Sequence, residues 1–297
     1  AGRHVRSAGE DILRGALALP AGTRIGPAQR MLLAGLGIAD LQVACRPRVA
    51  VLCTGRELVD DPMQALRPGQ IRNSNAPYLL ARLAEAGAET VHVETVSDDA
   101  DAFAEALRRA LAAGAGIILS TGAVSMGRYD FVPSALQALG AQVLFHKLRM
   151  RPGKPLLFAR LAEGPLFFGL PGNPMSGAVG LRFFVEIALH AQLGLADERP
   201  WRLPLVKAVR KMPELRMYQQ ARVQLGADHR LSVQVLRDQE SFRTRALLDA
   251  TAWAVLPEDG DELPAGTVVD VYALDHACNG ILGEPMPGKA IPGETTA

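Results

Sequence analysis

Hydrophobic positions between residues 48 and 196 alternate between short continuous runs and longer segments with helical spacing. Val49 to Cys53 is a continuous apolar run, which is typical of a strand buried on both faces. The pattern predicts further strands at 89–96, 116–120 and 166–168, and helices that begin near residues 75, 100, 131 and 174. Elements that alternate in this way predict an α/β fold, a doubly wound and mostly parallel sheet with helices on both faces.

The segments on either side of this α/β domain (48–196) have different patterns. Residues 1–47 contain a turn-rich stretch and one helix from Pro27 to about Leu36, and so short a segment cannot build a good core alone. We therefore expect it to pack on another domain or subunit. Residues 197–277 predict strands separated by turns, and hence a small all-β domain, whereas the Gly- and Pro-rich residues 278–297 predict a flexible tail.

Composition limits the classes of partner. The net charge of +1 and the aromatic content of only 5% argue against both nucleic acid and a membrane surface. Cys45, Cys53 and Cys278 are too few and too scattered for a disulfide framework or a zinc site. This cysteine usage, with no long apolar span and no signal-peptide pattern, favours a cytoplasmic location.

A basic segment and a Gly-Pro loop suggest an anionic ligand. Lys147, Arg149 and Arg151 alternate with apolar residues, so in one strand the three cations would share a face, and Lys154 follows at a Pro-Gly bend. Residues 169–174 then form a Gly-Pro loop that enters a helix, where free backbone N–H groups can bind an anion. Together these features favour a phosphorylated ligand, although a solvated face and an ordinary turn would explain each one separately.

Acidic residues follow several of the predicted strands. In open parallel sheets ligands bind outside the carboxyl ends of the strands, so Glu57, Asp98 and Asp130 could converge at one edge. Carboxylates facing phosphates suggest a bridging Mg²⁺. The alternatives are that Asp98 and Asp130 are helix caps and that Glu57 is a solvated acid; Ser125 and Ser176 could likewise be caps.

A set of motifs then resembles one family in order and spacing. The motifs are GEDI at 9–12, PAGTRIGP at 20–27, TGREL at 54–58, GQIRNSN at 69–75, SDD at 97–99, STGAVSMGRYD at 120–130, HKLRMRPGKP at 146–155 and GLPGNPMS at 169–176. Together they resemble the molybdopterin molybdotransferase family of bacterial MoeA and the gephyrin E domain, over residues 2–275.

The resemblance implies an enzyme of molybdenum cofactor biosynthesis. In the implied reaction molybdate is inserted into the dithiolene of adenylylated molybdopterin, with Mg²⁺, and AMP is released. It also implies a homodimer and a contact with a molybdopterin adenylyltransferase. Residues 1–47 would be the remnant of an N-terminal linker domain, and the family's first segment and inserted second domain would be missing.

Matching motif positions carry over functional roles from the family. The implied catalytic residues are Asp11, Glu57, Asp98, Asp130, Lys147 and Arg151. The implied metal ligands are Asp98, Asp130 and Glu57. The implied ligand-binding residues are Thr54, Gly55, Ser120, Gly122, Ser125, Lys154, Gly169, Pro171, Gly172, Asn173 and Ser176. Ser241 matches a serine of the family's last domain only loosely.

Several positions depart from the family pattern. Arg56 and Asn73 stand where the family has acids, Arg72 replaces a tyrosine, Ala123 replaces a glycine, and Arg151 replaces a lysine. Two alternatives stay open, and the substitutions at Arg56, Asn73 and Ala123 motivate the second of them. One is a molybdopterin adenylyltransferase, which resembles the α/β domain alone, and the other is a non-catalytic molybdopterin-binding paralogue.

Overall fold

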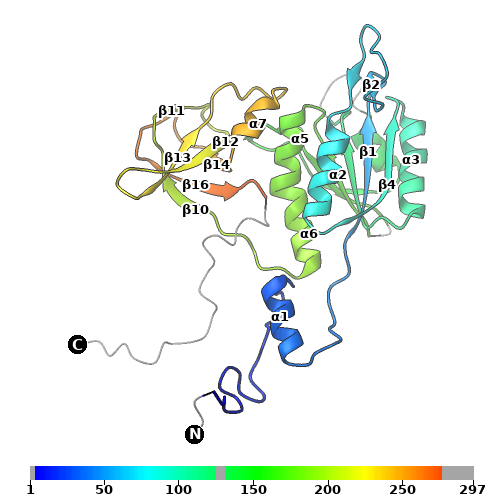
Figure 1. Ribbon diagram of the computed structural model, residues 1–297. Coiled ribbons are helices and arrows are strands. Elements are labelled where there is room, and N and C mark those ends of the chain that lie inside the picture. The colour runs from blue at the N-terminus through cyan, green and yellow to red at the C-terminus, as the bar shows by residue number, and fades with distance from the viewer. Residues whose placement is uncertain (1–3, 125–130, 163, 276–297) are drawn as a thin grey trace.

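The computed structural model describes residues 4–124, 131–162 and 164–275. It contains an α/β unit (residues 48–193) and a β unit (residues 201–273), with the N-terminal segment (residues 4–47) below them (Figure 1). Within the described ranges, none of the helices has the length and apolar character needed to cross a lipid bilayer.

The α/β unit is built on one six-stranded sheet. In spatial order the strands are β4 (Glu89–Val96), β1 (Arg48–Thr54), β5 (Ile117–Thr121), β9 (Leu166–Leu170), β8 (Leu157–Arg160) and β6 (Gln142–His146). The first four are parallel, whereas β8 and β6 are antiparallel to their neighbours. The predicted mostly parallel α/β fold is confirmed, although β8 was not among the predicted strands.

Helices cover both faces of this sheet. They are α2 (Asn75–Glu85), α3 (Ala100–Ala112), α4 (Val132–Ala138), α5 (Pro174–Gly180), a π-helical segment (Leu181–Val185) and α6 (Glu186–Leu193). Successive residues of β1 face opposite cores: Leu52 packs with Phe103 of α3, and Val51 packs with Leu83 of α2. The continuous apolar run of β1 is therefore explained by burial on both sides.

The basic segment is not one strand, so the prediction of a single cationic strand face is wrong. β6 ends at His146, and Lys147 has a left-handed backbone with φ of +68°. The short β7 (Met150–Arg151) then pairs with Arg216 and Met217 of the β unit. The cations thus lie on a connection between two sheets, because the chain leaves the first sheet before the alternation ends.

The β unit contains a second large sheet and a separate two-stranded sheet formed by β11 and β15. Its elements are β10 (Trp201–Pro204), β11 (Val209–Arg210), β12 (Arg216–Leu225), β13 (Leu231–Val235), the short helix α7 (Arg245–Asp249), β14 (Ala252–Leu256), β15 (Glu262–Leu263) and β16 (Val268–Ala273). The main order is β10-β16-β14-β12-β13, and a bridge between Leu205 and Val233 brings the first and last strands together. The sheet is therefore almost closed, which leaves few exposed edges.

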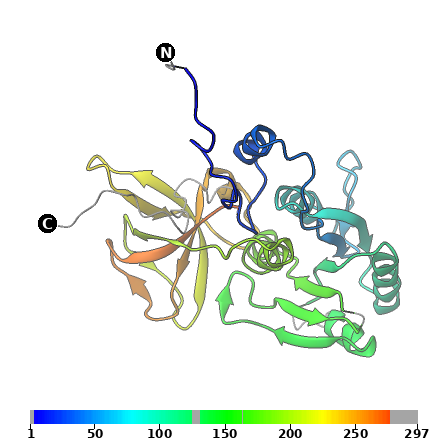
Figure 2. The ribbon, with the colours of Figure 1, turned by 90° about the horizontal axis from the view of Figure 1, so that it is seen from below.

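Aromatic side chains join the two units. Phe183 of the π-helical segment packs against Tyr218, Trp253 and Tyr272 of the β unit, at centroid distances of 4.5, 6.1 and 5.3 Å. Figure 2 looks along the long helix formed by α5 to α6 and shows it between the two sheets. The helix that covers one sheet is therefore also the surface on which the other sheet rests.

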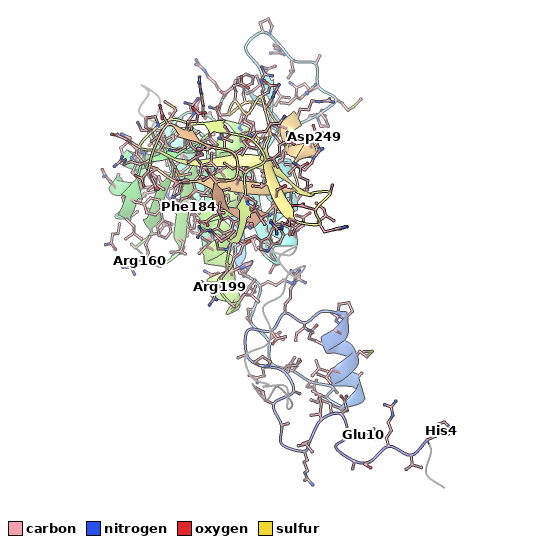
Figure 3. The ribbon with its side chains drawn as sticks, turned by 90° about the vertical axis from the view of Figure 1, so that its left-hand side faces the viewer. His4, Glu10, Arg160, Phe184, Arg199 and Asp249 are labelled. Carbon is pink, nitrogen blue, oxygen red and sulfur yellow. The ribbon has the colours of Figure 1, made fainter. Side chains whose placement is uncertain are left out.

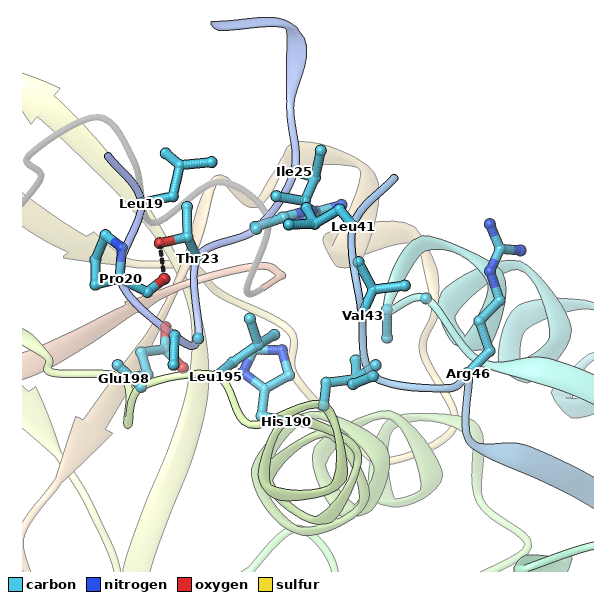
Figure 4. A pocket seen from close by; sticks show the side chains of 18 of the residues that line it. Leu19, Pro20, Thr23, Ile25, Leu41, Val43, Arg46, His190, Leu195 and Glu198 are labelled. Carbon is cyan, nitrogen blue, oxygen red and sulfur yellow. Dashed lines mark hydrogen bonds between the residues drawn. The ribbon is translucent and has the colours of Figure 1, made fainter. Parts of the chain in front are cut away.

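The N-terminal segment packs loosely. Its helix α1 (Pro27–Gly35) has no buried residue, and the segment extends away from the body with His4 and Glu10 at its far end (Figure 3). It encloses an open cavity of about 1570 Å³ against α6 and the turn that follows, where Val43 and Leu41 face His190 and Leu195 (Figure 4). Packing of this segment on a further domain or subunit remains a prediction.

A buried ionic cluster fixes the end of β16 to the helices. Arg82 of α2 contacts Glu186 of α6 at 2.5 Å, and Arg182 contacts Glu198 at 2.6 Å. Arg182 also donates two hydrogen bonds to the carbonyl oxygen of Ala273. Glu186 is only 1% exposed, and burial raises the pKa of its carboxyl to about 7 in spite of the two guanidinium groups.

We expect the unfolding free energy of the protein to depend on pH through the protonation of the Glu186 carboxyl. The pKa of this carboxyl in the folded protein lies above the ordinary value of 4.5. The protonated carboxyl therefore contributes fully to the unfolding free energy below pH 4.5, and this contribution is lost as the pH rises through about 7. Glu186→Gln imitates the protonated form. Between pH 5 and pH 8 the difference in unfolding free energy should therefore shift in favour of the variant, by on the order of 2 kcal/mol, in urea titrations.

The matched control is Glu85→Gln, because Glu85 pairs with the same Arg82 but is 58% exposed. That variant should differ from the wild type by the same small amount at both pH values. If Glu186→Gln instead became less stable relative to the wild type as the pH rises, the raised pKa of Glu186 would be wrong, since the ion pairs with arginine would then outweigh the effect of burial.

Candidate functional site

Three loops meet at the carboxyl edge of the six-stranded sheet. The Thr54 hydroxyl donates to the carbonyl oxygen of Thr121 at 2.9 Å, and the Gly122 amide donates to the carbonyl oxygen of Leu170 at 3.0 Å. Gly122 has φ of +89°, and a Cβ there would lie 2.7 Å from the oxygen atoms of Thr54. Only glycine fits this position, so the loops after β1, β5 and β9 touch through their main chains.

Asn75 adds the start of α2 to this junction. Its Nδ2 donates to the carbonyl oxygen of Gly172 at 2.8 Å, across 97 residues of sequence. Gly172 in turn lies over Gly122, since a Cβ on Gly172 would be 3.5 Å from the Cα of Gly122. We call Thr54, Asn75, Gly122 and Gly172 the loop junction. The sequence predicts that Asn75 begins a helix and places it in the GQIRNSN motif, but it carries no signal that identifies Gly172 as its partner.

The surroundings of Asn73 explain why an amide can stand where the family has an acid. It is 8% exposed, its Oδ1 accepts from the amide of Ala76, and its Nδ2 donates to Asp60 Oδ1 at 2.9 Å. Thr95 Oγ1 donates to the same Asp60 oxygen. An acid in place of Asn73 would set two carboxylates side by side, so this amide suits the arm formed by β2 (Leu58–Val59) and β3 (Ile71–Arg72).

Two of the three predicted acids occupy neighbouring loops. The Glu57 carboxylate lies close to Gly55, where a Cβ would be 2.7 Å from Oε1. Asp98 Oδ2 accepts from the Arg56 amide at 3.2 Å. The interpretation of Asp98 as the helix cap is wrong, because Asp99 caps α3 by accepting from two first-turn amides.

Asp130, the third acid, lies outside the described residues, as does Ser125. Among the residues that the structure does describe, no group of three His, Cys, Asp or Glu side chains could hold a metal ion. Of the three predicted acids, the structure therefore describes Glu57 and Asp98, and the Mg²⁺ site stays a prediction.

The cations lie at the rim of this edge. Lys147 and Lys154 are exposed and belong to one hairpin, in which the Lys147 amide donates to Leu156 and the Leu148 amide donates to Lys154. The bend at Gly153 approaches the start of α5, since a Cβ there would be 3.7 Å from the carbonyl oxygen of Ser176. Arg151 instead contacts the Met212 sulfur in the β unit.

His146 is a second residue that the sequence argument did not select. Its Nε2 lies 2.8 Å from the carbonyl oxygen of Val124, and it therefore ties β6 to the loop after β5. The same Val124 packs on Gly169, where a Cβ would lie 2.7 Å from a Val124 methyl group. Gly169 thus has a packing role beneath the loop.

The start of α5 is not a free anion site, and the expectation of bare amides there is wrong for its first turn. Pro174 has no N–H, Met175 donates to the carbonyl oxygen of Ser241 at 3.0 Å, and Ser176 and Gly177 both donate to Asn173. Pro171, Ser176 and Ser120 are buried, whereas Gly172 and Asn173 are exposed. The accessible part of this loop is therefore Gly172–Asn173.

The β unit closes over α5 through residues that sequence reasoning missed. Gln239 accepts from the Gln220 amide at 2.6 Å and donates to the Gln220 carbonyl oxygen at 2.9 Å. Gln220 Nε2 contacts the Met175 sulfur at 3.2 Å. These contacts join residues that are far apart in sequence, and no local pattern could have indicated them.

Asp11 is not brought to this edge. It is exposed in the N-terminal segment, beside Glu10, at the opposite end of the α/β unit from the loop junction (Figures 1 and 3). The large cavity of Figure 4 is lined by none of the predicted site residues, because it lies under that same segment. Within this chain, Asp11 and the loop junction are therefore separate.

The sequence matches two family models and several curated relatives over most of its length. A model of a probable molybdopterin binding domain matches residues 50–191, and a model of the MoeA C-terminal region (domain IV) matches residues 202–274. A molybdopterin molybdenumtransferase from Synechococcus elongatus is 39% identical over 275 residues, covering 92% of this chain and 67% of that protein. One from Bacillus subtilis is 36% identical over 279 residues, covering 92% and 63%.

Solved structures give the same result for the fold. A molybdopterin biosynthesis MoeA protein from Pyrococcus horikosii superposes with a TM-score of 0.76 at 26% identity, covering 90% of this chain and 64% of that chain. A molybdenum cofactor biosynthesis protein from Pyrococcus furiosus superposes with a TM-score of 0.67 at 24% identity, covering 89% and 82%, which shows the fold alone. The chain spans about two thirds of the length of the curated relatives, 67% and 63%. Since the match to these transferases extends over nearly all of the described residues, the chain belongs to the molybdopterin molybdenumtransferase family.

Proposed function

We propose that this chain binds adenylylated molybdopterin at the loop junction and acts in the insertion of molybdate into its dithiolene, with release of AMP. The observation that carries the proposal is the contact of Thr54, Gly122 and Gly172, where main chain meets main chain at the carboxyl edge. A ligand can approach such a surface closely, and the exposed Lys147 and Lys154 beside it suit phosphate groups.

The role of the chain would be to position the substrate and neutralise its charge. The substrate carries phosphate groups, and molybdate adds a second anion, so the repulsion between them must be screened. Lys147 and Lys154 would lie against the phosphates, and Gly172 and Asn173 would line the exposed turn. No side chain is needed as a nucleophile, because orientation and electrostatic stabilisation suffice.

Mg²⁺ is part of this proposal. Glu57 and Asp98 come from adjacent loops, and Mg²⁺ in proteins commonly binds one or two carboxylates together with water and substrate phosphates. The two acids fit that requirement, with Asp130 as the third candidate ligand. The bound ion would neutralise charge on the phosphate and molybdate oxygens.

We also infer a cytoplasmic homodimer in which the N-terminal segment packs on the partner. Leu13, Leu17 and Met31 are 70%, 80% and 77% exposed, and apolar side chains grouped on one segment favour a covered surface. In the dimer, Asp11 of one protomer would reach the loop junction of the other. A molybdopterin adenylyltransferase, which makes the adenylylated substrate, is the expected transient partner.

The reaction itself provides the direct test. Incubation of the chain with adenylylated molybdopterin, Mg²⁺ and molybdate should release AMP and yield molybdenum cofactor. Asp98→Asn should slow AMP release about tenfold or more while ligand retention changes little, because a metal-directed charge is lost and the shape is kept. Equal rates would exclude Asp98 from the metal site.

Other outcomes of the same assay separate the alternatives. ATP-dependent adenylylation of metal-free molybdopterin would favour an adenylyltransferase instead. Tight binding of adenylylated molybdopterin without turnover would favour a non-catalytic paralogue.

Substitution of Asn75 should weaken ligand binding without lowering the stability of α2, the helix that it begins. Asn75→Asp places a carboxylate against the Gly172 carbonyl oxygen, but an acid in the first turn of α2 is favourable for the helix. We therefore expect an unchanged melting temperature and binding of adenylylated molybdopterin weakened about five- to tenfold, measured by equilibrium dialysis. Ser74→Asp, which adds the same charge one residue earlier, should leave binding unchanged. Equal losses in both variants would show an effect of charge alone.

The close contact at Gly122 can be separated from its backbone strain. Gly122→Ala introduces a Cβ 2.7 Å from Thr54, whereas Gly140→Ala has a similar φ of +73° with nothing within 4 Å. In both variants the left-handed conformation should lower the unfolding free energy by about 1 kcal/mol. Only Gly122→Ala should lose about 2 kcal/mol more, because of the close contact, and only this variant should also lose ligand binding. Denaturant unfolding of the two variants measures the difference. Equal costs would show that the loops can separate freely.

A further inference from the structure

The loop between β13 and α7 (residues 236–244) is fastened next to the accessible Gly172–Asn173 turn. Gln239 forms two hydrogen bonds with the main chain of Gln220 and a third with the carbonyl oxygen of Leu236. The Ser241 carbonyl oxygen then accepts from the Met175 amide at 3.0 Å, at the first turn of α5. The loop is therefore anchored to β12 through Gln239 and to the first turn of α5 through Ser241.

An aromatic side chain follows this contact directly. Phe242 is 65% exposed, and among the described residues it is the only aromatic side chain that is mostly in solvent. The other described aromatic rings serve the cores and the contact between the two units. A single exposed apolar side chain is not unusual, but this one is adjacent to the residue that contacts α5.

The neighbouring charges give Phe242 a defined environment. The guanidinium of Arg243 lies 5.8 Å from the centroid of the Phe242 ring, within the range of a cation–π contact. Arg243 Nε lies 2.7 Å from Glu240 Oε2, which orients the guanidinium. The ring is thus arranged beside a cation in advance, and an exposed ring next to a cation suits a planar heterocycle that carries a phosphate.

We propose that Phe242 is a specificity-determining residue that stacks on the adenine of the adenylyl group, with Arg243 facing its phosphate. The inference rests on the proposed function and extends it, because it assigns the nucleotide end of the ligand to the β unit. Gly172 and Asn173 then lie between the two ends of the ligand, since Met175 joins that turn to Ser241.

Calorimetric titration of the whole chain with AMP, ribose 5-phosphate and inorganic phosphate tests this inference. The wild type should bind AMP more tightly than ribose 5-phosphate. Phe242→Ala should weaken AMP binding about tenfold and leave ribose 5-phosphate binding within about twofold, because only the base is stacked. Phe242→Trp should retain AMP binding, which shows that the position requires an aromatic ring.

Leu248→Ala is the matched control, since Leu248 is 85% exposed on the nearby α7 and is not part of the loop. It should bind all three compounds as the wild type does. Unchanged AMP binding in Phe242→Ala, or an equal loss for AMP and ribose 5-phosphate, would overturn the stacking role while the proposed function stands. If the wild type binds neither AMP nor adenylylated molybdopterin, the proposed function fails as well.

Discussion

The contact between Gly122 and Thr54 is the constraint on which the carboxyl edge depends. Thr54 ends β1, and its hydroxyl donates to the carbonyl oxygen of Thr121, the last residue of β5. This hydrogen bond fixes the distance between the starts of the loops after β1 and β5. Gly122 can then turn with a positive φ directly over Thr54 and donate to Leu170 of β9. Since main-chain atoms pack here without a Cβ between them, the edge forms a surface of peptide groups that a ligand can approach closely.

The long helix formed by α5 to α6 joins this edge to the β unit. Its start touches Ser241, its middle carries Phe183 into the aromatic contact, and Arg182 holds the carbonyl oxygen of Ala273 at the end of β16. One rigid element therefore sets both the loop that leaves β9 and the position of the β unit. This arrangement brings residues of the β unit next to the loop after β9, although each unit has its own sheet.

The acids show the same dependence on distant contacts. Asp98 could have been an ordinary cap, but the structure gives that role to Asp99 and turns Asp98 toward the loop after β1. Asn73, in place of an acid, supplies the donor that Asp60 requires. A departure from the family pattern is thus accommodated by its neighbours, and it does not by itself argue against ligand binding.

Much of the α/β unit could be predicted from the sequence because its signals are local. The apolar run of β1, the capped start of α3 and the left-handed glycines after the helices are fixed by burial and backbone sterics within a few residues. Glu57, Asp98 and the Gly-Pro loop could be placed at one edge because parallel strands end together.

What only the tertiary structure decided is which distant groups meet. The basic segment divides between two sheets, since β7 pairs with β12 of the β unit, and its alternation alone would have suggested one strand. The first-turn amides of α5 are occupied because Ser241, more than sixty residues away, supplies a carbonyl oxygen. Periodicity depends on each residue's own neighbours along the chain, whereas hydrogen bonds between loops depend on how whole sheets pack, and a single sequence carries no local signal for that.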